Sequence, residues 1–139
     1  MDQVDDIQIQ LPAKAQYLNI VSACILAMAE HVEELEAQEQ TVYQIQLAVH
    51  EICNNIIEHA YQNSEGSYLL KLRIDSEKRQ VSADIFDQGE AFDFSDVSEP
   101  NLDEPQDKGY GLFLVRHLVD EVSYESSDQN NHWFLTKKY

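Results

Sequence analysis

The segment HEICNNIIEHA, residues 50–60, combines an apolar helical pattern with polar side chains suited to metal and phosphate chemistry. Glu51, Asn55 and His59 are four residues apart, so they are predicted to lie along one side of a helix. A carboxylate beside an amide oxygen can hold hydrated magnesium, which completes its shell with phosphate oxygens. The glutamate could also orient or deprotonate a hydroxyl group. A solvated helix face is the alternative interpretation, and the role of Asn54 stays open.

A second polar group stands at the end of a predicted strand, in the sequence FDQGEAF. Val81, Ala83 and Ile85 alternate with polar residues, and Asp87 continues their phase. Its carboxylate is therefore predicted to point to the buried side of the sheet, where it could accept a hydrogen bond from an amino group. Gly89 permits a close approach or a positive φ just beyond it. A tight turn capped by an aspartate is the alternative interpretation.

A third group is the sequence DKGYGLFLV, in which Gly109 and Gly111 open a predicted helix directly after Lys108. The N-terminus of such a helix presents unpaired backbone N–H groups and the positive end of a dipole to phosphate. A flexible hinge into a helix is the alternative, because two glycines separated by one residue are a weak signal. Neither a P-loop nor a complete GxGxxG pattern is present in the chain.

These three groups must be positioned by a small set of strands and helices. Strands are predicted over residues 5–11, 68–74, 81–85, 122–126 and 132–137, and helices over 13–38, 41–61 and 109–121. Thr41 is predicted to cap the second helix. Because the strands are grouped in hairpins, the sheet should be mostly antiparallel with the helices on one face. This arrangement is an α+β two-layer sandwich.

The acidic region over residues 88–108 shows no clear period and separates the second polar group from the third. A segment of this length is uncommon inside a small domain unless it works as a lid or a binding loop. We therefore expect the 139 residues to form one domain, with residues 88–108 as its lid.

Composition restricts the class of partner. The chain has 9 basic and 26 acidic residues, for a formal net charge of −17, which argues against nucleic acid and against an anionic membrane surface. It favours a partner with a basic patch. Cys24 and Cys53 fall in apolar helical stretches and are expected to be buried, reduced thiols of a cytosolic protein. Trp133, on a terminal strand, is expected to serve packing.

The order of the three polar groups resembles the N, G1 and G2 boxes of the GHKL superfamily of ATPases and kinases. The segments LAVHEICNNIIEHAY, DQGEAFDFS and DKGYGLFLVRHLVDEVSY look most like the bacterial anti-sigma-factor serine/threonine kinases. The resemblance extends from about Thr41 to the C-terminus. It implies the Bergerat ATP-binding fold, with ATP and Mg²⁺ as cofactors.

The resemblance implies a role for each matched residue of the first two boxes. Glu51 matches the catalytic glutamate that activates the substrate hydroxyl, and Asn55 matches the asparagine that binds magnesium. His59 matches the end of the N box. Asp87 matches the aspartate that hydrogen-bonds the adenine amino group, and Gly89 matches the adjoining glycine.

The third box and the lid complete the implied ATP site. Gly109 and Gly111 match the glycines that wrap the triphosphate, and residues 88–108 match the ATP lid. Lys108 is a candidate phosphate contact, and Arg116, further into the helix, is a weaker one. The chain departs from the family where the G1 box often has a second glycine, since Ala91 occupies that place.

The function implied by the resemblance is that of an anti-sigma factor in the bacterial cytoplasm. Such a protein sequesters a sigma factor and uses Mg-ATP to phosphorylate an anti-anti-sigma protein of the STAS fold. A non-catalytic module that binds the same partners is the alternative. Glu51 argues against that alternative, because a purely binding domain has no physical need for a base beside the metal. The chain is not expected to be a two-component histidine kinase, and homodimerisation stays open.

Overall fold

The computed structural model of the chain describes residues 4–92 and 110–139. Its strands are β1 (Val4–Pro12), β2 (Ser67–Asp75), β3 (Gln80–Asp87), β4 (Glu121–Ser127) and β5 (Asn130–Lys138). Its helices are α1 (Leu18–Ala29), α2 (Glu33–Glu36), α3 (Glu39–Asn55) and α4 (Tyr110–Leu118), with a 3₁₀ turn η1 (Ala15–Tyr17) and a π-helical turn η2 (Ile56–Ala60).

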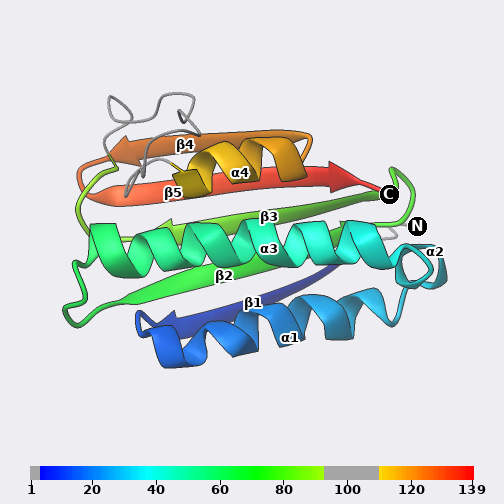
Figure 1. The fold of residues 1–139 in the computed structure, drawn as a ribbon, viewed down its shortest axis with the longest axis horizontal. Coiled ribbons are helices and arrows are strands. Elements are labelled where there is room, and N and C mark those ends of the chain that lie inside the picture. The colour runs from blue at the N-terminus through cyan, green and yellow to red at the C-terminus, as the bar shows by residue number, and fades with distance from the viewer. Residues whose placement is uncertain (1–3, 93–109) are drawn as a thin grey trace, which may run out of the picture.

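The five strands form one antiparallel sheet in the order β1-β2-β3-β5-β4. Helices α1, α3 and α4 cover a single face of this sheet (Figure 1). The predicted α+β two-layer sandwich is therefore confirmed. The C-terminal end of α3, the end of β3 and the beginning of β5 lie at the same end of the sheet, which brings distant parts of the sequence together (Figure 1).

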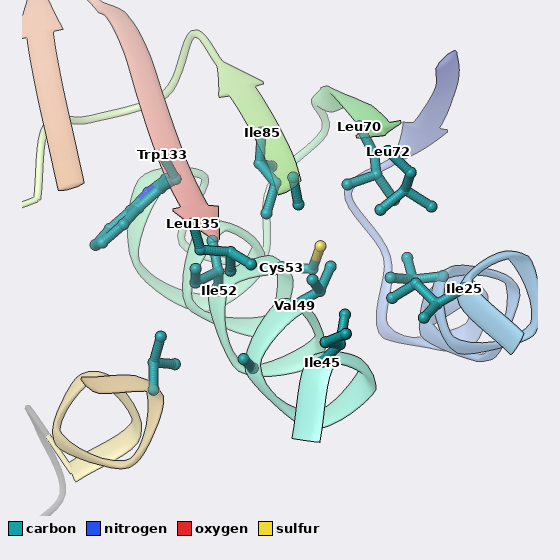
Figure 2. Close-up of a cluster of buried hydrophobic side chains, with 14 of the residues drawn as sticks. Ile25, Ile45, Val49, Ile52, Cys53, Leu70, Leu72, Ile85, Trp133 and Leu135 are labelled. Carbon is teal, nitrogen blue, oxygen red and sulfur yellow. The ribbon is translucent and has the colours of Figure 1, made fainter. Parts of the chain in front are cut away.

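The core lies between the sheet and the helices, with α3 at its centre. Ile45, Val49 and Ile52 of α3 are buried between this helix and the sheet, and Ile52 lies near Leu135 of β5 (Figure 2). Strands β2 and β3 alternate buried and partly exposed residues along most of their length, as their apolar pattern predicts. Trp133 is buried on β5, in agreement with the expected packing role.

The two cysteines differ in their surroundings. Cys53 is buried in the core beneath the sheet, and burial raises the pKa of its thiol to about 12. Cys24 is only half-buried on α1, so the prediction that both thiols are buried is wrong for this residue. No helix in the described part of the chain is long and apolar enough to cross a bilayer.

The prediction of a single helix over residues 13–38 is wrong, because the chain bends after Ala29. Val32 is extended (φ −122°, ψ 100°), and the short α2 follows it. The bend places Leu35 in the core, where it lines the same small cavity as Ile25 and Val42. Burying a leucine side chain stabilises a fold by about 1.5–3 kcal/mol, which offsets the interrupted helix.

Two helix ends also differ from the prediction. Helix α3 begins at Glu39 rather than at Thr41, whose hydroxyl donates a hydrogen bond to the side chain of Gln38 at 3.2 Å instead of capping the helix. Helix α4 ends at Leu118, before the predicted end at residue 121. The Asp120 N–H already donates to the Thr136 carbonyl of β5 at 2.9 Å, so the chain joins the sheet at that point.

Candidate functional site

The candidate site begins where α3 passes into the wider π-helical turn η2. Tyr61 N–H donates to the carbonyl of Ile56 at 3.0 Å, five residues back, which widens the last turn. The Ala60 carbonyl at the end of this turn accepts a hydrogen bond from Glu90 N–H at 2.8 Å. This hydrogen bond connects the end of η2 to the segment that follows β3. π-Helical turns inside helices are often found at functional sites.

Gly89 is required by the closeness of that contact. A Cβ atom at residue 89 would lie 2.5 Å from the Ala60 carbonyl oxygen and 2.6 Å from its carbonyl carbon. Both are backbone atoms that no side-chain rotation can move. Of the two explanations that the sequence offers for this glycine, the structure supports a close backbone approach rather than a positive φ.

Asp87 ends β3 with its side chain turned to the covered face of the sheet, as predicted, and it is 4% exposed. Its Oδ1 accepts hydrogen bonds from Gly89 N–H at 2.9 Å and from the Asn131 side-chain amide at 2.8 Å. The bond from Gly89 also makes Asp87 a turn cap, so the alternative interpretation of this residue holds as well. Burial raises the pKa of Asp87, and the hydrogen bonds from Asn131 and Gly89 lower it in part.

A cavity of about 400 Å³ lies between the end of α3 and the beginning of α4. Its polar lining consists of Glu51, Asn54, Asn55, Glu58 and His59 from α3 and η2, and its apolar lining includes Phe92, Leu112, Val115 and Trp133. The predicted stripe of Glu51, Asn55 and His59 therefore lines a cavity, with His59 exposed at its surface.

Gly111 lies against the Glu51 carboxylate. A Cβ atom at residue 111 would be 2.8 Å from Glu51 Oε2, so the missing side chain leaves room for this carboxylate to stand in the cavity. Of the two glycines that open the predicted helix, Gly111 is thus brought to the site. Gly109, Lys108 and residues 93–107 of the predicted lid lie outside the described residues.

A second, smaller space of about 10 Å³ adjoins Asp87. It shares four lining residues with the larger cavity, namely Asn55, His59, Phe92 and Trp133. The two spaces therefore share one continuous wall, which includes Glu51, Asn55, His59, Asp87 and Gly111. Gly89 is bonded to Asp87 in this wall. Arg116 is exposed and lies instead with Asp120 and Phe134 on another side of α4.

Oxygen ligands for a metal ion are present in this wall, but in small number. Among residues 4–92 and 110–139 there is no cluster of three or more His, Cys, Asp or Glu side chains that would hold a metal ion by themselves. The carboxylate of Glu51 and the amides of Asn54 and Asn55 line the larger cavity. Such a set suits magnesium that takes the rest of its shell from phosphate and water.

Sequence interpretation missed two features of the site. Asn131 of β5 is buried and bonded to Asp87, although the sequence places it beside a polar turn. Phe92, Tyr124 and Trp133 form an aromatic cluster at the wall, with ring centroids 5.5 Å apart for Phe92 and Trp133 and 4.5 Å apart for Tyr124 and Trp133. The pairing of Asp87 with Asn131 in the β3–β5 hydrogen-bond register was the signal needed to find Asn131.

Comparisons with known proteins give the family of the chain. Residues 11–137 match the family of the histidine kinase-like ATPase domain. Over 131 residues the chain is 27% identical to the serine-protein kinase RsbW of Bacillus cereus strain G9842, covering 88% of this chain and 78% of the relative. It is 26% identical to the RsbW of Bacillus thuringiensis subsp. konkukian strain 97-27, with the same coverage.

Two solved structures have a similar fold. The crystal structure of the RsbU and RsbW domains of Rv1364c from Mycobacterium tuberculosis superposes with a TM-score of 0.67 at 20% identity, covering 96% of this chain and 32% of that one. The histidine kinase domain of a blue-light activated kinase from Erythrobacter litoralis EL346 superposes with a TM-score of 0.56 at 18% identity, covering 92% and 61%. Since the family match spans nearly the whole sequence, the chain belongs to the histidine kinase-like ATPase domain family.

Proposed function

We propose that the protein is an ATP-dependent serine/threonine protein kinase that also acts as an anti-sigma factor. In this function it phosphorylates an anti-anti-sigma protein of the STAS fold and sequesters a sigma factor. The observation that carries the proposal is the common wall that joins Glu51, Asn55 and Gly111 to Asp87. The similarity to serine-protein kinases named RsbW supports it.

The Asp87 end of the wall suits the base of ATP. Its buried carboxylate is an acceptor held in place by two donors on Oδ1, and it can accept a hydrogen bond from the amino group of adenine. The flanking Phe92 and Trp133 offer apolar and aromatic surface to a flat ring. The base would thus be bound by one directional polar contact and by apolar contacts around it.

The Glu51 end suits the triphosphate and its metal ion. Asn55 would contribute an amide oxygen to magnesium, and the α4 terminus near Gly111 would contribute the positive end of its dipole to phosphate. Lys108 and Gly109 precede this terminus in the sequence, and we include them in the proposed phosphate contacts. When bound, Mg-ATP supplies the phosphoryl group and neutralises its charge.

Glu51 is the proposed catalytic residue. Its carboxylate reaches the cavity beside Gly111 and has room there to orient or deprotonate an incoming hydroxyl. Phosphoryl transfer depends mostly on positioning and on charge neutralisation, so one base and one metal site are sufficient chemistry. The net charge of −17 fits partners that present basic residues to this surface.

Incubation with labelled ATP, Mg²⁺ and candidate STAS proteins tests the proposal. We expect transfer of label to a serine or threonine of the partner. Glu51→Gln should lower the rate by about 10²-fold or more, because it removes the base and keeps the shape, while ATP affinity changes little. Glu33→Gln, on the exposed surface of α2, is the matched control and should transfer at the wild-type rate.

The same experiment separates the kinase from a non-catalytic module. Wild-type protein that binds ATP and the partner but transfers no label would contradict the kinase function and support the module. A Glu51→Gln variant that transfers as fast as wild type would contradict the role given to this carboxylate.

A further inference from the structure

Asn131 is buried, with 1% of its surface exposed, and it lies directly opposite Asp87 in the β3–β5 register. Its Nδ2 donates to Asp87 Oδ1 at 2.8 Å and to the Gly89 carbonyl at 2.9 Å. Its Oδ1 accepts a hydrogen bond from the Ser126 hydroxyl at 2.6 Å. The side-chain amide thus has partners of the right kind on both its nitrogen and its oxygen.

These partners fix the orientation of the amide. A flipped amide would place its oxygen against the Asp87 carboxylate and the Gly89 carbonyl, which are both acceptors. It would also lose the acceptor that the Ser126 hydroxyl uses. Asn131 therefore presents donors, and only donors, to the end of β3.

The donors act on one oxygen of Asp87. Within residues 4–92 and 110–139, the hydrogen bonds to this carboxylate come from Gly89 and Asn131, and both end on Oδ1. Hydrogen bonds to the charged form oppose the effect of burial and favour a carboxylate that accepts rather than donates. No hydrogen bond within these residues ends on the second oxygen, and Asp87 lines the small space that also adjoins Asn55, His59, Phe92 and Trp133.

We propose that Asn131 is a positioning residue that makes the site select a base with an exocyclic amino group over one with a carbonyl at the same place. This inference rests on the proposed ATP site. A carboxylate held as an acceptor binds the amino group of adenine and repels the carbonyl of hypoxanthine. Without Asn131, Asp87 loses one of its two donors, can rotate, and protonates more readily, and a protonated carboxyl can donate to that carbonyl.

Titration of the chain with ATP and with inosine triphosphate tests this selectivity. Trp133 is the single tryptophan and lines both spaces, so its fluorescence reports binding directly. Wild type should prefer ATP by about 100-fold, because a site built for a hydrogen-bond donor rejects an analogue that lacks it. In Asn131→Ala the ratio of the two affinities should fall at least about tenfold.

The matched control is Thr136→Ala, which truncates another buried polar side chain of β5. Both variants should lower the unfolding midpoint, but Thr136→Ala should keep the wild-type ratio of affinities. Ser126→Ala leaves Asn131 in place and removes its third partner, so its ratio should fall by less than that of Asn131→Ala. This order of effects would not result from general destabilisation.

A pH series adds a readout that a purely structural role would not change. Asn131→Ala should lose selectivity further as the pH falls, because its Asp87 protonates at higher pH than in wild type. His59, Glu90 and Tyr124 also line the space at Asp87, so each variant is compared with wild type at the same pH.

The outcomes separate the two levels of the proposal. Absence of ATP binding by wild type would overturn the proposed nucleotide site itself. Wild-type preference for ATP together with an unchanged ratio and pH profile in Asn131→Ala would overturn the positioning role alone.

Discussion

The two ends of the candidate site are built in opposite ways. At the Asp87 end the polar groups bond to one another, through Gly89, Asn131 and Ser126, and the space beside them is about 10 Å³. At the Glu51 end the cavity is about 400 Å³. There, the side chains of Glu51, Asn54 and Asn55 form no hydrogen bond to another described residue.

This difference separates an end that is preorganised by its own hydrogen bonds from an end whose polar side chains face a cavity. A network whose donors and acceptors are matched holds its groups rigidly and stabilises the fold before any ligand binds. Polar side chains that face a cavity without partners among the described residues are available to a ligand. The Asp87 end should therefore be sensitive in stability, and the Glu51 end in activity. Two pairs of variants and one single variant test that distinction.

The two glycines of the site should give the largest contrast. Gly89→Ala places a Cβ atom 2.5 Å from backbone oxygen, and overpacking of this kind costs about 1–3 kcal/mol. Gly111→Ala places a Cβ atom 2.8 Å from the end of the Glu51 side chain, which can rotate away. We expect a loss of free energy of unfolding of about 2–3 kcal/mol for the first and less than about 1 kcal/mol for the second.

Urea denaturation of both variants measures this contrast. Gly111→Ala should still lower phosphoryl transfer, because the displaced Glu51 carboxylate leaves its position. Equal losses of stability in the two variants would contradict the view that one end is rigid and the other is adaptable.

Asp87→Asn should give the next largest effect, and its sign differs between binding and stability. ATP affinity should fall by more than about tenfold, or 1.4 kcal/mol, because an amide NH2 group that takes the place of the second carboxylate oxygen cannot accept a hydrogen bond from the adenine amino group. The amide oxygen of asparagine can still accept from Gly89 and Asn131. The turn at the end of β3 should therefore keep its shape.

The stability of the same variant depends on pH. Because burial raises the pKa of Asp87 above its ordinary value of 3.8, the folded chain binds this proton more tightly than the unfolded chain. The contribution of Asp87 to stability is therefore greatest in acid and is lost as the pH rises through the raised pKa. Relative to wild type, Asp87→Asn should be more stable near pH 7 than near about pH 4. A variant with unchanged ATP affinity and lower relative stability at pH 7 would contradict both assignments.

Much of this arrangement follows from local pattern, and the remainder depends on contacts between distant segments. The inward position of Asp87 follows from the period of its strand, and the shared face of Glu51 and Asn55 follows from helical spacing. The contact of Gly111 with Glu51 requires the packing of α4 on α3. The bond from Asn131 to Asp87 joins residues 44 apart through the pairing of β3 and β5.

The break in the first predicted helix has a similar origin. Apolar spacing continues through residues 18–35, so periodicity alone favours one helix. The bend at Val32 is decided by the place where Leu35 enters the core, against side chains of α1 and α3. The residue types predict neither the position where Leu35 enters the core nor the π-helical turn at the end of α3, because both are consequences of tertiary packing.

The adjacent asparagines of α3 should give the smallest effect and the most direct test of the open end. Alanine is about 0.6 kcal/mol more favourable than asparagine in a helix, and the side chains of Asn54 and Asn55 form no hydrogen bond to another described residue. Asn54→Ala and Asn55→Ala should therefore each stabilise the fold by about 0.5 kcal/mol. Only Asn55→Ala should weaken magnesium-dependent ATP binding, because we assign the metal contact to Asn55 and none to Asn54. Urea denaturation and ATP titration with and without Mg²⁺ measure the two effects. A loss of stability in both variants would mean that this end is bonded within the protein like the Asp87 end, and the contrast between the two ends would fail.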